Sequence, residues 1–451
     1  MRDRVADTAP ALFTDLYELT MLEAYLGERM DESAVFSLFV RRLPAERNFL
    51  LACGLDTVLS YLETLRFTDD DIAYLASLGR FSPRLLDWLR AFRFTGDVYA
   101  VPEGTPVFAN EPILEVVAPI AQGQLIETLV MNQIHLQTVL ASKAARVVAA
   151  ARGRPVIDFG ARRMHGIDAA LKAARAFSIG GVAATSNVLA GKRYGVPVAG
   201  TMAHSYIQAH EDESAAFRAF ARLYPETVIL VDTYDTLAGV RKVIELVRGS
   251  GEDIRIGAIR LDSGDLVALS REARRLLDDA GLHSVRIFAS GGLDEHAIAQ
   301  IVASGAPIDS FGVGTKMGVS SDAPDLDIAY KLTEYAGKGR LKLSTAKPIL
   351  PGRKQVFRVE AEAVAVRDVI ARWTDSLPAR PLLRAVMRNG VRLPDAQETL
   401  GESRKRADRE IARLPLRLRA LEPADPPYPV EVSNALLSYR QEVEKAVHPG
   451  R

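Results

Sequence analysis

The sequence predicts an α/β protein whose central part is a parallel, barrel-like series of strands and helices. Three observations indicate this class. Short apolar strands alternate with helical segments from residue 155 to residue 316. The helical segments begin at residues that cap helices and end at glycines, as in consecutive βα units. Neither a GxGxxG turn after an early strand nor a P-loop lysine motif occurs, which disfavours the rival open, doubly wound sheet.

The composition is that of a folded protein with no global preference for a charged partner. The chain has 451 residues, of which 48% are hydrophobic and 25% charged, and this length is enough for a large barrel and a second body. Lys+Arg and Asp+Glu both number 57, so neither nucleic acid nor a membrane surface is expected as a partner. Cys53 is the single cysteine, which excludes an internal disulfide and a cysteine zinc cluster. No signal-like apolar segment is visible, so a cytoplasmic location is expected.

The first 125 residues predict an α+β lobe, and a long helix leads from it into the next domain. Thr14 or Asp15 caps the first helix, which carries a leucine face. The expected elements are a helix at 12–26, a strand at 34–40, short helices at 55–65, 70–78 and 83–92, two or three strands within 97–117, and the long helix at 122–151.

Residues 126–325 are expected to form the barrel domain that holds the active site. Asp235 and Asp294 cap two of its helices, and glycines follow the ends of both. The predicted strands are 156–159, 177–181, 196–201, 227–231, 256–261, 285–289 and 308–313.

The strand–helix alternation stops after residue 325. Residues 326–451 predict antiparallel strands, a charged helix at 396–420, an extended linker at 425–430 and a last helix at 433–446. We expect this third segment to pack on the N-terminal lobe.

Polar side chains gather at the carboxyl ends of the first barrel strands, the edge that faces ligands in such folds. Arg162 and Arg163 follow one strand, Ser186 lies in a hydroxyl-rich helix start, and Thr201 with His204 follows another strand. A basic pair, hydroxyls and a histidine suit an anionic substrate and chemistry in which the histidine gains or passes a charged group.

The last two barrel strands end in glycine turns at 290–292 and 312–315. Consecutive turns of this kind often bind phosphate through backbone N–H groups, although they can also simply link strand to helix. In the segment RLDSGD, Arg260 can bind a carboxylate or phosphate, while Asp262 and Asp265 can hold ribose hydroxyls, hold Mg²⁺ or cap a helix.

Asp232 ends the strand before that segment. Its carboxylate can accept a proton from the ring of His204 and so select the ring's tautomer, or it can cap the following helix. No spacing of histidines and carboxylates indicates a metal site, so the metal ligands remain unassigned.

Eight motifs in order extend this interpretation: TDLYELTM (14–21), DFGARR (158–163), TSNVLAGK (185–192), GTMAHS (200–205), VDTYDT (231–236), RLDSGD (260–265), ASGGLDE (289–295) and GVGTKM (312–317). Together they resemble the nicotinate phosphoribosyltransferase family. The resemblance implies a seven-stranded irregular (β/α) barrel, a second α+β domain built from both chain ends, and a homodimer with shared active sites. It also implies an enzyme of the ATP-dependent ligase class, with Mg²⁺ and with ATP as co-substrate. Nicotinate would displace pyrophosphate from 5-phosphoribosyl-1-pyrophosphate to form nicotinate mononucleotide, a step of NAD biosynthesis.

The resemblance also implies residue roles. His204 matches the histidine that ATP phosphorylates, and Asp232 is assigned to catalysis with it. Nicotinate contacts are expected from Tyr17, Phe159, Arg162, Ser186, Thr201 and Arg260, with Phe159 stacking on the pyridine ring and Tyr17 coming from the second subunit. Contacts with 5-phosphoribosyl-1-pyrophosphate are expected from Asp262, Ser263, Gly264, Gly291, Gly292, Gly314 and Thr315.

Other functions remain as alternatives. A nicotinamide phosphoribosyltransferase resembles the barrel region, but an aspartate there matches Ser186, and an aspartate would repel the carboxylate of nicotinate. Quinolinate phosphoribosyltransferases are shorter and lack a matching histidine. A phosphosugar lyase or isomerase would need a Schiff-base lysine, for which Lys316 is the candidate. A non-catalytic binding homologue would not need His204, Asp232, Arg260 and Asp262 intact.

Overall fold

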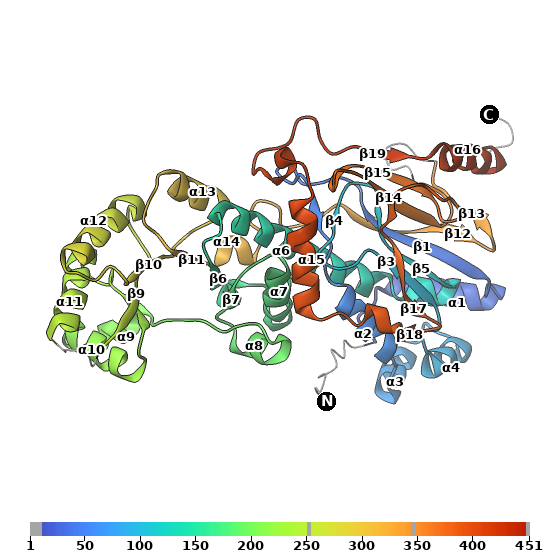
Figure 1. Cartoon of the computed structure of the whole chain (residues 1–451). Helices are drawn as coiled ribbons and strands as arrows, with labels where there is room; N and C mark the ends of the chain where they lie inside the picture. Colours follow the sequence, from blue (N-terminus) through green and yellow to red (C-terminus); the bar gives the residue numbers. More distant parts are fainter. Residues whose placement is uncertain (1–10, 250–253, 344–348, 448–451) are drawn as a thin grey trace. The chain divides into compact units, whose positions relative to one another are not determined.

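The computed structural model describes residues 11–249, 254–343 and 349–447, and the chain forms two compact units (Figure 1). Unit 1 contains both ends of the chain, Met1–Ser142 and Asp325–Arg451, and unit 2 is the segment Lys143–Pro324. The three-part division at residues 125/126 and 325/326 that the sequence suggests stays a prediction. Within the described residues, no helix combines the length and apolarity needed to cross a bilayer.

The larger sheet of unit 1 joins strands from the two ends of the chain in an antiparallel order. β1 (Ser33–Val40) contains the apolar and aromatic residues that favour strands, and Leu38 lies opposite Leu114 on one neighbour and Tyr330 on the other. The order is β13 (Lys338–Gly339), β12 (Ile328–Tyr335), β1, β5 (Pro112–Pro119), β3 (Asp97–Ala100), β17 (Arg384–Arg388) and β18 (Val391–Arg392).

A second, four-stranded sheet of unit 1 is formed mainly by a hairpin. Its turn residues Glu362 and Ala363 both have positive φ angles, as a two-residue turn of type I′ requires. The order is β16 (Arg380–Pro381), β14 (Lys354–Ala361), β15 (Val364–Arg372) and β19 (Val430–Val432). A further pair consists of β2 (Leu50–Leu51) and β4 (Pro106–Val107).

The helices of unit 1 agree with the expected ones except near the C-terminus. The charged helix expected at 396–420 ends earlier, and a 3₁₀ turn follows Pro415, whose ring removes the N–H that a continued helix needs. The helices are α1 (Leu16–Glu28), α2 (Leu55–Thr64), α3 (Asp69–Ser77), α4 (Pro83–Ala91), α5 (Ile120–Leu125), α15 (Leu400–Ala412) and α16 (Asn434–Val447), with 3₁₀ turns η3 (Pro394–Ala396) and η4 (Leu416–Arg419). Helix α6 (Glu127–Ala151) continues from unit 1 into unit 2.

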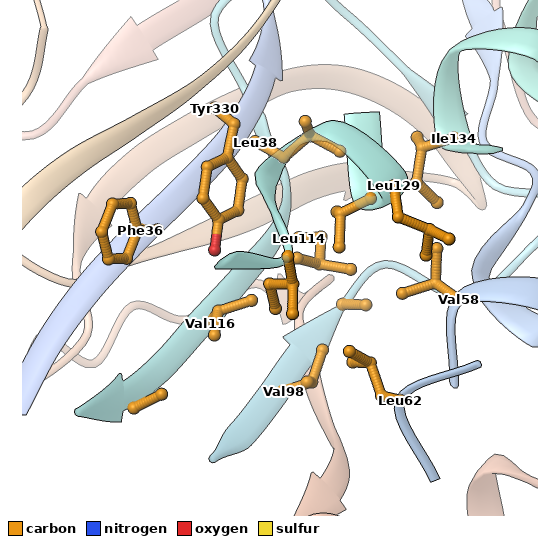
Figure 2. Packing of buried hydrophobic residues seen from close by; sticks show 14 of the residues in the cluster. Phe36, Leu38, Val58, Leu62, Val98, Leu114, Val116, Leu129, Ile134 and Tyr330 are labelled. Atoms are coloured by element: carbon orange, nitrogen blue, oxygen red, sulfur yellow. The ribbon is translucent and has the colours of Figure 1, made fainter. Parts of the chain in front are cut away.

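The core of unit 1 lies where strands of the larger sheet meet α2 and the first part of α6 (Figure 2). The rings of Phe36 and Tyr330 stack with centroids 5.0 Å apart. Figure 2 shows further members of this buried cluster: Leu38, Val58, Leu62, Val98, Leu114, Val116, Leu129 and Ile134. Because the apolar face of each element is removed from water here, this cluster stabilises unit 1 as one body.

Unit 2 has a curled parallel sheet in the form of a half-barrel, so the α/β class predicted from the sequence is confirmed. The order is β7 (Ala184–Thr185), β6 (Val156–Asp158), β11 (Ser310–Val313), β10 (Arg286–Ala289), β9 (Ile256–Leu261) and β8 (Thr227–Leu230), and all neighbours are parallel. Among the described residues, no ladder joins β7 to β8, so the sheet does not close.

Two of the seven strands expected in this unit are not strands. Residues 177–181 begin within helix α7 (Ile167–Ile179), because an apolar run this short has the same pattern in a buried helix end as in a strand. The strand beside β6 is instead β7, a few residues later. In the segment 196–201 only Val198 forms a bridge, with Thr185.

The remaining helices of unit 2 connect the strands, and several of them begin at side-chain caps. Asp235 and Asp294 accept backbone N–H bonds from Ala238 and Ala297 at 2.7 and 2.8 Å, which confirms the predicted caps. The elements are η1 (Ala161–Arg163), α8 (Val188–Tyr194), α9 (His204–Gln208), α10 (Glu213–Leu223), α11 (Thr236–Gly249), α12 (Leu266–Asp279), α13 (Glu295–Ala303) and α14 (Thr315–Gly318). Gly251, expected to follow α11, lies outside the described residues.

Candidate active site

An open pocket lies in unit 2 where β6, β9, β10 and β11 end. Four cations and only one carboxylate line it, together with four glycines, which suits an anionic ligand. The lining residues are Phe159, Arg162, Arg163, Arg260, Asp262, Ser290, Gly291, Gly292, Leu293, Gly312, Gly314, Thr315 and Lys316.

The glycine turns allow close approaches that a side chain would prevent. Gly291 has a φ of +93°, and a Cβ atom there would lie 1.8 Å from the carbonyl oxygen of Asp262. A Cβ atom on Gly312 would lie 2.7 Å from the ring of Phe159. The glycines therefore bring the ends of β9, β10 and β11 together and leave room for the aromatic ring beside the turns.

Arg260, Asp262 and Ser290 form a closed set of hydrogen bonds in the pocket. Arg260 donates from Nε to Ser290 Oγ at 2.7 Å and from Nη2 to Asp262 Oδ1 at 2.6 Å, and Ser290 Oγ donates to the same Oδ1 at 2.5 Å. Burial alone would raise the pKa of Asp262, but the Ser290 hydroxyl and the charge of Arg260 outweigh it and hold this pKa below its usual value. Asp262 is therefore an anion at neutral pH.

His204 is the first residue of α9, and its ring faces two polar groups. Nδ1 lies 3.1 Å from Thr233 Oγ1, and Nε2 lies 3.8 Å from Asp262 Oδ2. The side chain of His204 is 41% exposed, so a ligand can reach it.

The sequence suggests that Asp232 contacts the ring of His204. In the described part of the chain, the Asp232 carboxylate makes no such contact. Its Oδ2 instead accepts from Asp262 N at 2.8 Å and from Ser263 Oγ at 2.7 Å. Thr233, the next residue, takes the place beside the histidine. The carboxylate of Asp232 thus orders the loop that carries Asp262, and its catalytic role stays a prediction.

The other predicted residues divide between the pocket and its surroundings. Phe159, Arg162, Gly291, Gly292, Gly314 and Thr315 line the pocket as expected, whereas Ser186, Thr201, Ser263 and Gly264 are not part of its lining. Asp265 accepts from the N–H groups of Val267 and Ala268, so the helix-cap alternative describes it. Tyr17 belongs to unit 1, where its side chain on α1 is half-exposed.

Asp158 anchors the strand end that presents Phe159. Its carboxylate is buried and accepts from Gly160 N and from Thr185 Oγ1, both at 2.7 Å. Burial raises the pKa of Asp158, opposed by these two hydrogen bonds. The side chain therefore ties β6 to β7 directly beside the pocket.

The sequence places Arg163 in a basic pair, Ser290 in a glycine turn and Lys316 at a strand end, but it does not indicate their hydrogen-bond partners. Arg163 donates to Thr315 Oγ1 at 3.3 Å, and Lys316 donates to Asp294 Oδ2 at 2.6 Å. Each residue lies within one of the motifs DFGARR, ASGGLDE and GVGTKM, and this position is the sequence feature that points to the pocket. Their side-chain directions depend on contacts between separate strand ends, which the sequence does not display.

A second, more apolar cavity lies within unit 1. It is lined by residues such as Phe39, Ile370 and Val432, with Lys354 and Arg440 as its cations. Lys354 donates to Gly352 O at 2.6 Å, and Arg440 donates to Glu444 at 2.7 Å, so both cations are already engaged. The cationic pocket of unit 2, with four cations in its lining, is therefore the better candidate for an anion site.

Parallel strand ends that carry a cationic pocket beside a histidine are typical of an α/β protein that binds an anionic ligand at the carboxyl edge of its sheet. Two family models match the chain: the nicotinate phosphoribosyltransferase N-terminal domain at residues 12–135 and the nicotinate phosphoribosyltransferase family at residues 155–356. The chain belongs to the nicotinate phosphoribosyltransferase family of enzymes.

Individual relatives extend this similarity over nearly the whole chain. Nicotinate phosphoribosyltransferase pncB2 of Mycobacterium tuberculosis is 54% identical over 444 residues, covering 98% of this chain and 96% of the relative. Nicotinate phosphoribosyltransferase of Bacillus subtilis is 44% identical, covering 84% and 79%. The crystal structure of human nicotinic acid phosphoribosyltransferase superposes with a TM-score of 0.84 at 28% identity, covering 96% of this chain and all of that chain.

Proposed function

We propose that this protein forms nicotinate mononucleotide and pyrophosphate from nicotinate and 5-phosphoribosyl-1-pyrophosphate, as a step of NAD biosynthesis. The observation that carries the proposal is the pocket in which Arg260 lies over Phe159, beside the two glycine turns. The guanidinium carbon is 5.3 Å from the centroid of the phenyl ring. An aromatic surface and a cation placed together suit an aromatic acid, and the glycine turns suit a phosphate.

In this reaction the ring nitrogen of nicotinate forms a bond to C1 of the ribose. The C1–O bond breaks, and its electron pair leaves with pyrophosphate. Because the transition state is cation-like at the sugar and strongly anionic at the leaving group, cations around the phosphates lower the barrier. Arg162, Arg163 and Lys316 line the pocket and are the side chains that we assign to this role.

We also propose that ATP phosphorylates His204 and that this step assists the reaction. A ring nitrogen would attack the γ-phosphorus as the bond to the ADP oxygen breaks, and water would later release phosphate. The half-exposed ring and the Thr233 contact at Nδ1 support this role, because a hydroxyl at one nitrogen can select the tautomer with a free lone pair on the other. A phosphoryl group there would add negative charge next to Asp262 and so change the affinities for anions.

Magnesium fits the site only together with a substrate. Among the described residues, no three histidine, cysteine or acidic side chains gather in a metal-binding group. Mg²⁺ commonly binds through one or two carboxylates plus phosphate oxygens and water. Asp232 and Asp262 are the residues that would hold it, since Asp232 Oδ1 has no hydrogen-bond partner in the described part of the chain. When bound, the ion would neutralise charge on the pyrophosphate.

A homodimer with shared sites remains part of the proposal, with Tyr17 of the second subunit contacting the pyridine ring. Mixing Tyr17→Ala protein with His204→Ala protein tests it. A shared site predicts that subunit exchange restores activity, because one site of each mixed dimer then carries both wild-type residues, whereas sites formed within one subunit predict no recovery.

Product analysis tests the function itself. The protein is incubated with 5-phosphoribosyl-1-pyrophosphate, with either nicotinate or nicotinamide, and with or without ATP. We expect nicotinate mononucleotide as the main product and more of it when ATP is present. Preferential formation of nicotinamide mononucleotide would replace the proposal with the nicotinamide alternative, and no nucleotide product from either substrate would overturn it.

A further inference from the structure

We propose that Ser290 is a positioning residue for substrate recognition, because its hydroxyl holds Arg260 in the orientation that receives the carboxylate of the substrate. The inference rests on the proposed function. Ser290 lies at the end of β10, and its side chain is buried. Its hydroxyl is already engaged by Arg260 and Asp262, so we expect it to act through these two side chains.

The hydroxyl of Ser290 both accepts and donates a hydrogen bond within the pocket. It accepts from Arg260 Nε at 2.7 Å and donates to Asp262 Oδ1 at 2.5 Å. Arg260 Nη2 donates to the same oxygen at 2.6 Å, so the three side chains are joined in a closed triangle of hydrogen bonds. A hydroxyl can donate once and accept at the same time, so Ser290 is suited to bridge a cation and an anion.

These three hydrogen bonds leave one nitrogen of Arg260 and one oxygen of Asp262 available for other contacts. Arg260 Nε and Nη2 are engaged, whereas Nη1 has only a long contact of 3.5 Å to Met202 O. The guanidinium group lies over the ring of Phe159. A carboxylate on an aromatic ring held by Phe159 would therefore meet Nη1. The second carboxylate oxygen of Asp262 stays on the side of His204.

Another arginine in the protein indicates what Arg260 would do without the hydroxyl. In unit 1, Arg358 donates from Nε to Asp368 Oδ1 at 2.9 Å and from Nη2 to Oδ2 at 2.6 Å. Both carboxylate oxygens are then consumed by one guanidinium. Ser290 prevents this pairing in the pocket, because it occupies Nε and restricts Arg260 to a single oxygen of Asp262.

The backbone explains how Ser290 reaches Asp262. Gly291 follows it, and the missing side chain allows the turn to lie directly against the backbone carbonyl of Asp262. Ser290 N also donates to Leu261 O at 2.8 Å. The motif Ser-Gly-Gly therefore has two functions in one turn: the first glycine makes the close approach possible, and the serine uses it to hold Arg260.

Ser290→Ala, compared with Ser290→Thr, tests the inference in the full-length enzyme. The measurements are KM and kcat for nicotinate, for nicotinamide and for 5-phosphoribosyl-1-pyrophosphate. We expect Ser290→Ala to raise KM for nicotinate about tenfold, the effect of one hydrogen bond to a charged group. Its KM for the phosphorylated sugar should change little, and its preference for nicotinate over nicotinamide should fall. Ser290→Thr keeps the hydroxyl and should recover most of the preference.

Ser320→Ala is the matched control for a loss of stability. Ser320 is buried in the same unit, and its hydroxyl donates to Ala323 O at 2.8 Å, but it does not line the pocket. Ser320→Ala should lower Tm by an amount similar to that of Ser290→Ala and leave the substrate preference as it is in the wild type.

The outcomes separate this inference from the proposed function. Turnover of nicotinate by the wild type decides the function, and if the wild type does not use nicotinate the inference falls with it. If the wild type is active and Ser290→Ala keeps its preference, only the role of Ser290 is wrong. The same conclusion follows if folded Ser290→Thr is impaired as much as Ser290→Ala.

Discussion

The protein contains two arginine–aspartate pairs that have the same residue types but differ in solvent exposure. We call the buried pair in unit 1 the closed pair and the partly exposed pair in unit 2 the open pair. In unit 1, Arg358 and Asp368 are in contact at 2.6 Å with side chains 1% and 0% exposed. In unit 2, Arg260 and Asp262 are also in contact at 2.6 Å, but their side chains are 13% and 28% exposed. Each arginine lies near an aromatic ring, and each aspartate accepts from a hydroxyl, Tyr428 in one case and Ser290 in the other.

The difference between the pairs is how many carboxylate oxygens the arginine uses. Arg358 binds both oxygens of Asp368, and both side chains are buried, so a ligand cannot reach the closed pair. Arg260 binds one oxygen of Asp262, so a nitrogen and an oxygen remain directed to the pocket. The closed pair is thus confined to the interior of unit 1, and we propose that the open pair serves binding, although the residue types are the same.

The largest expected effect concerns the residue that faces the open pair. Incubation of the wild type with γ-labelled ATP should give an acid-labile label, and His204→Ala should give none, because the phosphoryl acceptor is gone. Tm should barely change, since the half-exposed ring of His204 contributes little packing. Label that persists in the variant would place the phosphoryl group on another residue.

Breaking the closed pair should affect stability instead of chemistry. Asp368→Ala leaves Arg358 buried without its anion, which typically costs about 3–5 kcal/mol of unfolding free energy. Chemical denaturation measures this loss, and kcat/KM of the molecules that remain folded should match that of the wild type. A stable Asp368→Ala protein with altered kinetics would mean that the closed pair takes part in binding.

Removing the cation of the open pair should weaken substrate binding with little loss of stability. Arg260→Met removes a charge-assisted contact worth about 1.5–3 kcal/mol, or about ten- to a hundredfold in affinity for nicotinate. Titration calorimetry with nicotinate measures the affinity, and thermal melting is the control. Unchanged affinity would show that the carboxylate binds elsewhere.

A new anion at Ser186, whose N–H donates to Asp158 O at 2.9 Å beside Phe159, should change substrate choice. Ser186→Asp is expected to lower kcat/KM for nicotinate relative to nicotinamide by about tenfold, because like charges repel across the site. Ser186→Asn has a similar size without the charge and serves as the control. If both variants keep the wild-type ratio, Ser186 does not face the carboxylate.

A pH-dependent effect on stability alone is expected from a buried carboxyl group of unit 1. Burial raises the pKa of Glu18 to about 7, although hydrogen bonds from Thr14 and Thr128 oppose the rise. A raised carboxyl pKa contributes stability that is present below the unfolded value of 4.5 and is lost as pH rises through about 7. Relative to Glu18→Gln, the wild type should therefore lose unfolding free energy between these values. Parallel pH profiles of the two proteins would contradict this.

Local patterns in the sequence were enough for much of the fold. Apolar alternation predicts β1, and the positions of Asp235 and Asp294 predict two helix caps. The structure confirms all three. The pattern failed at residues 177–181, where a buried helix end and a buried strand have the same composition. It also could not show that the parallel sheet stays open.

The sequence by itself predicts which polar residues follow parallel strand ends, because such strands direct their carboxyl ends to one edge and the motifs lie there. It therefore predicts a site at His204, Arg260, Asp262 and both glycine turns. Only the tertiary structure decided how these groups pair: Thr233 instead of Asp232 at the histidine ring, and Ser290 between Arg260 and Asp262. Hydrogen bonds between separate strand ends depend on distances of a few tenths of an ångström, and these are set by the packing of the whole sheet rather than by any local run of residues.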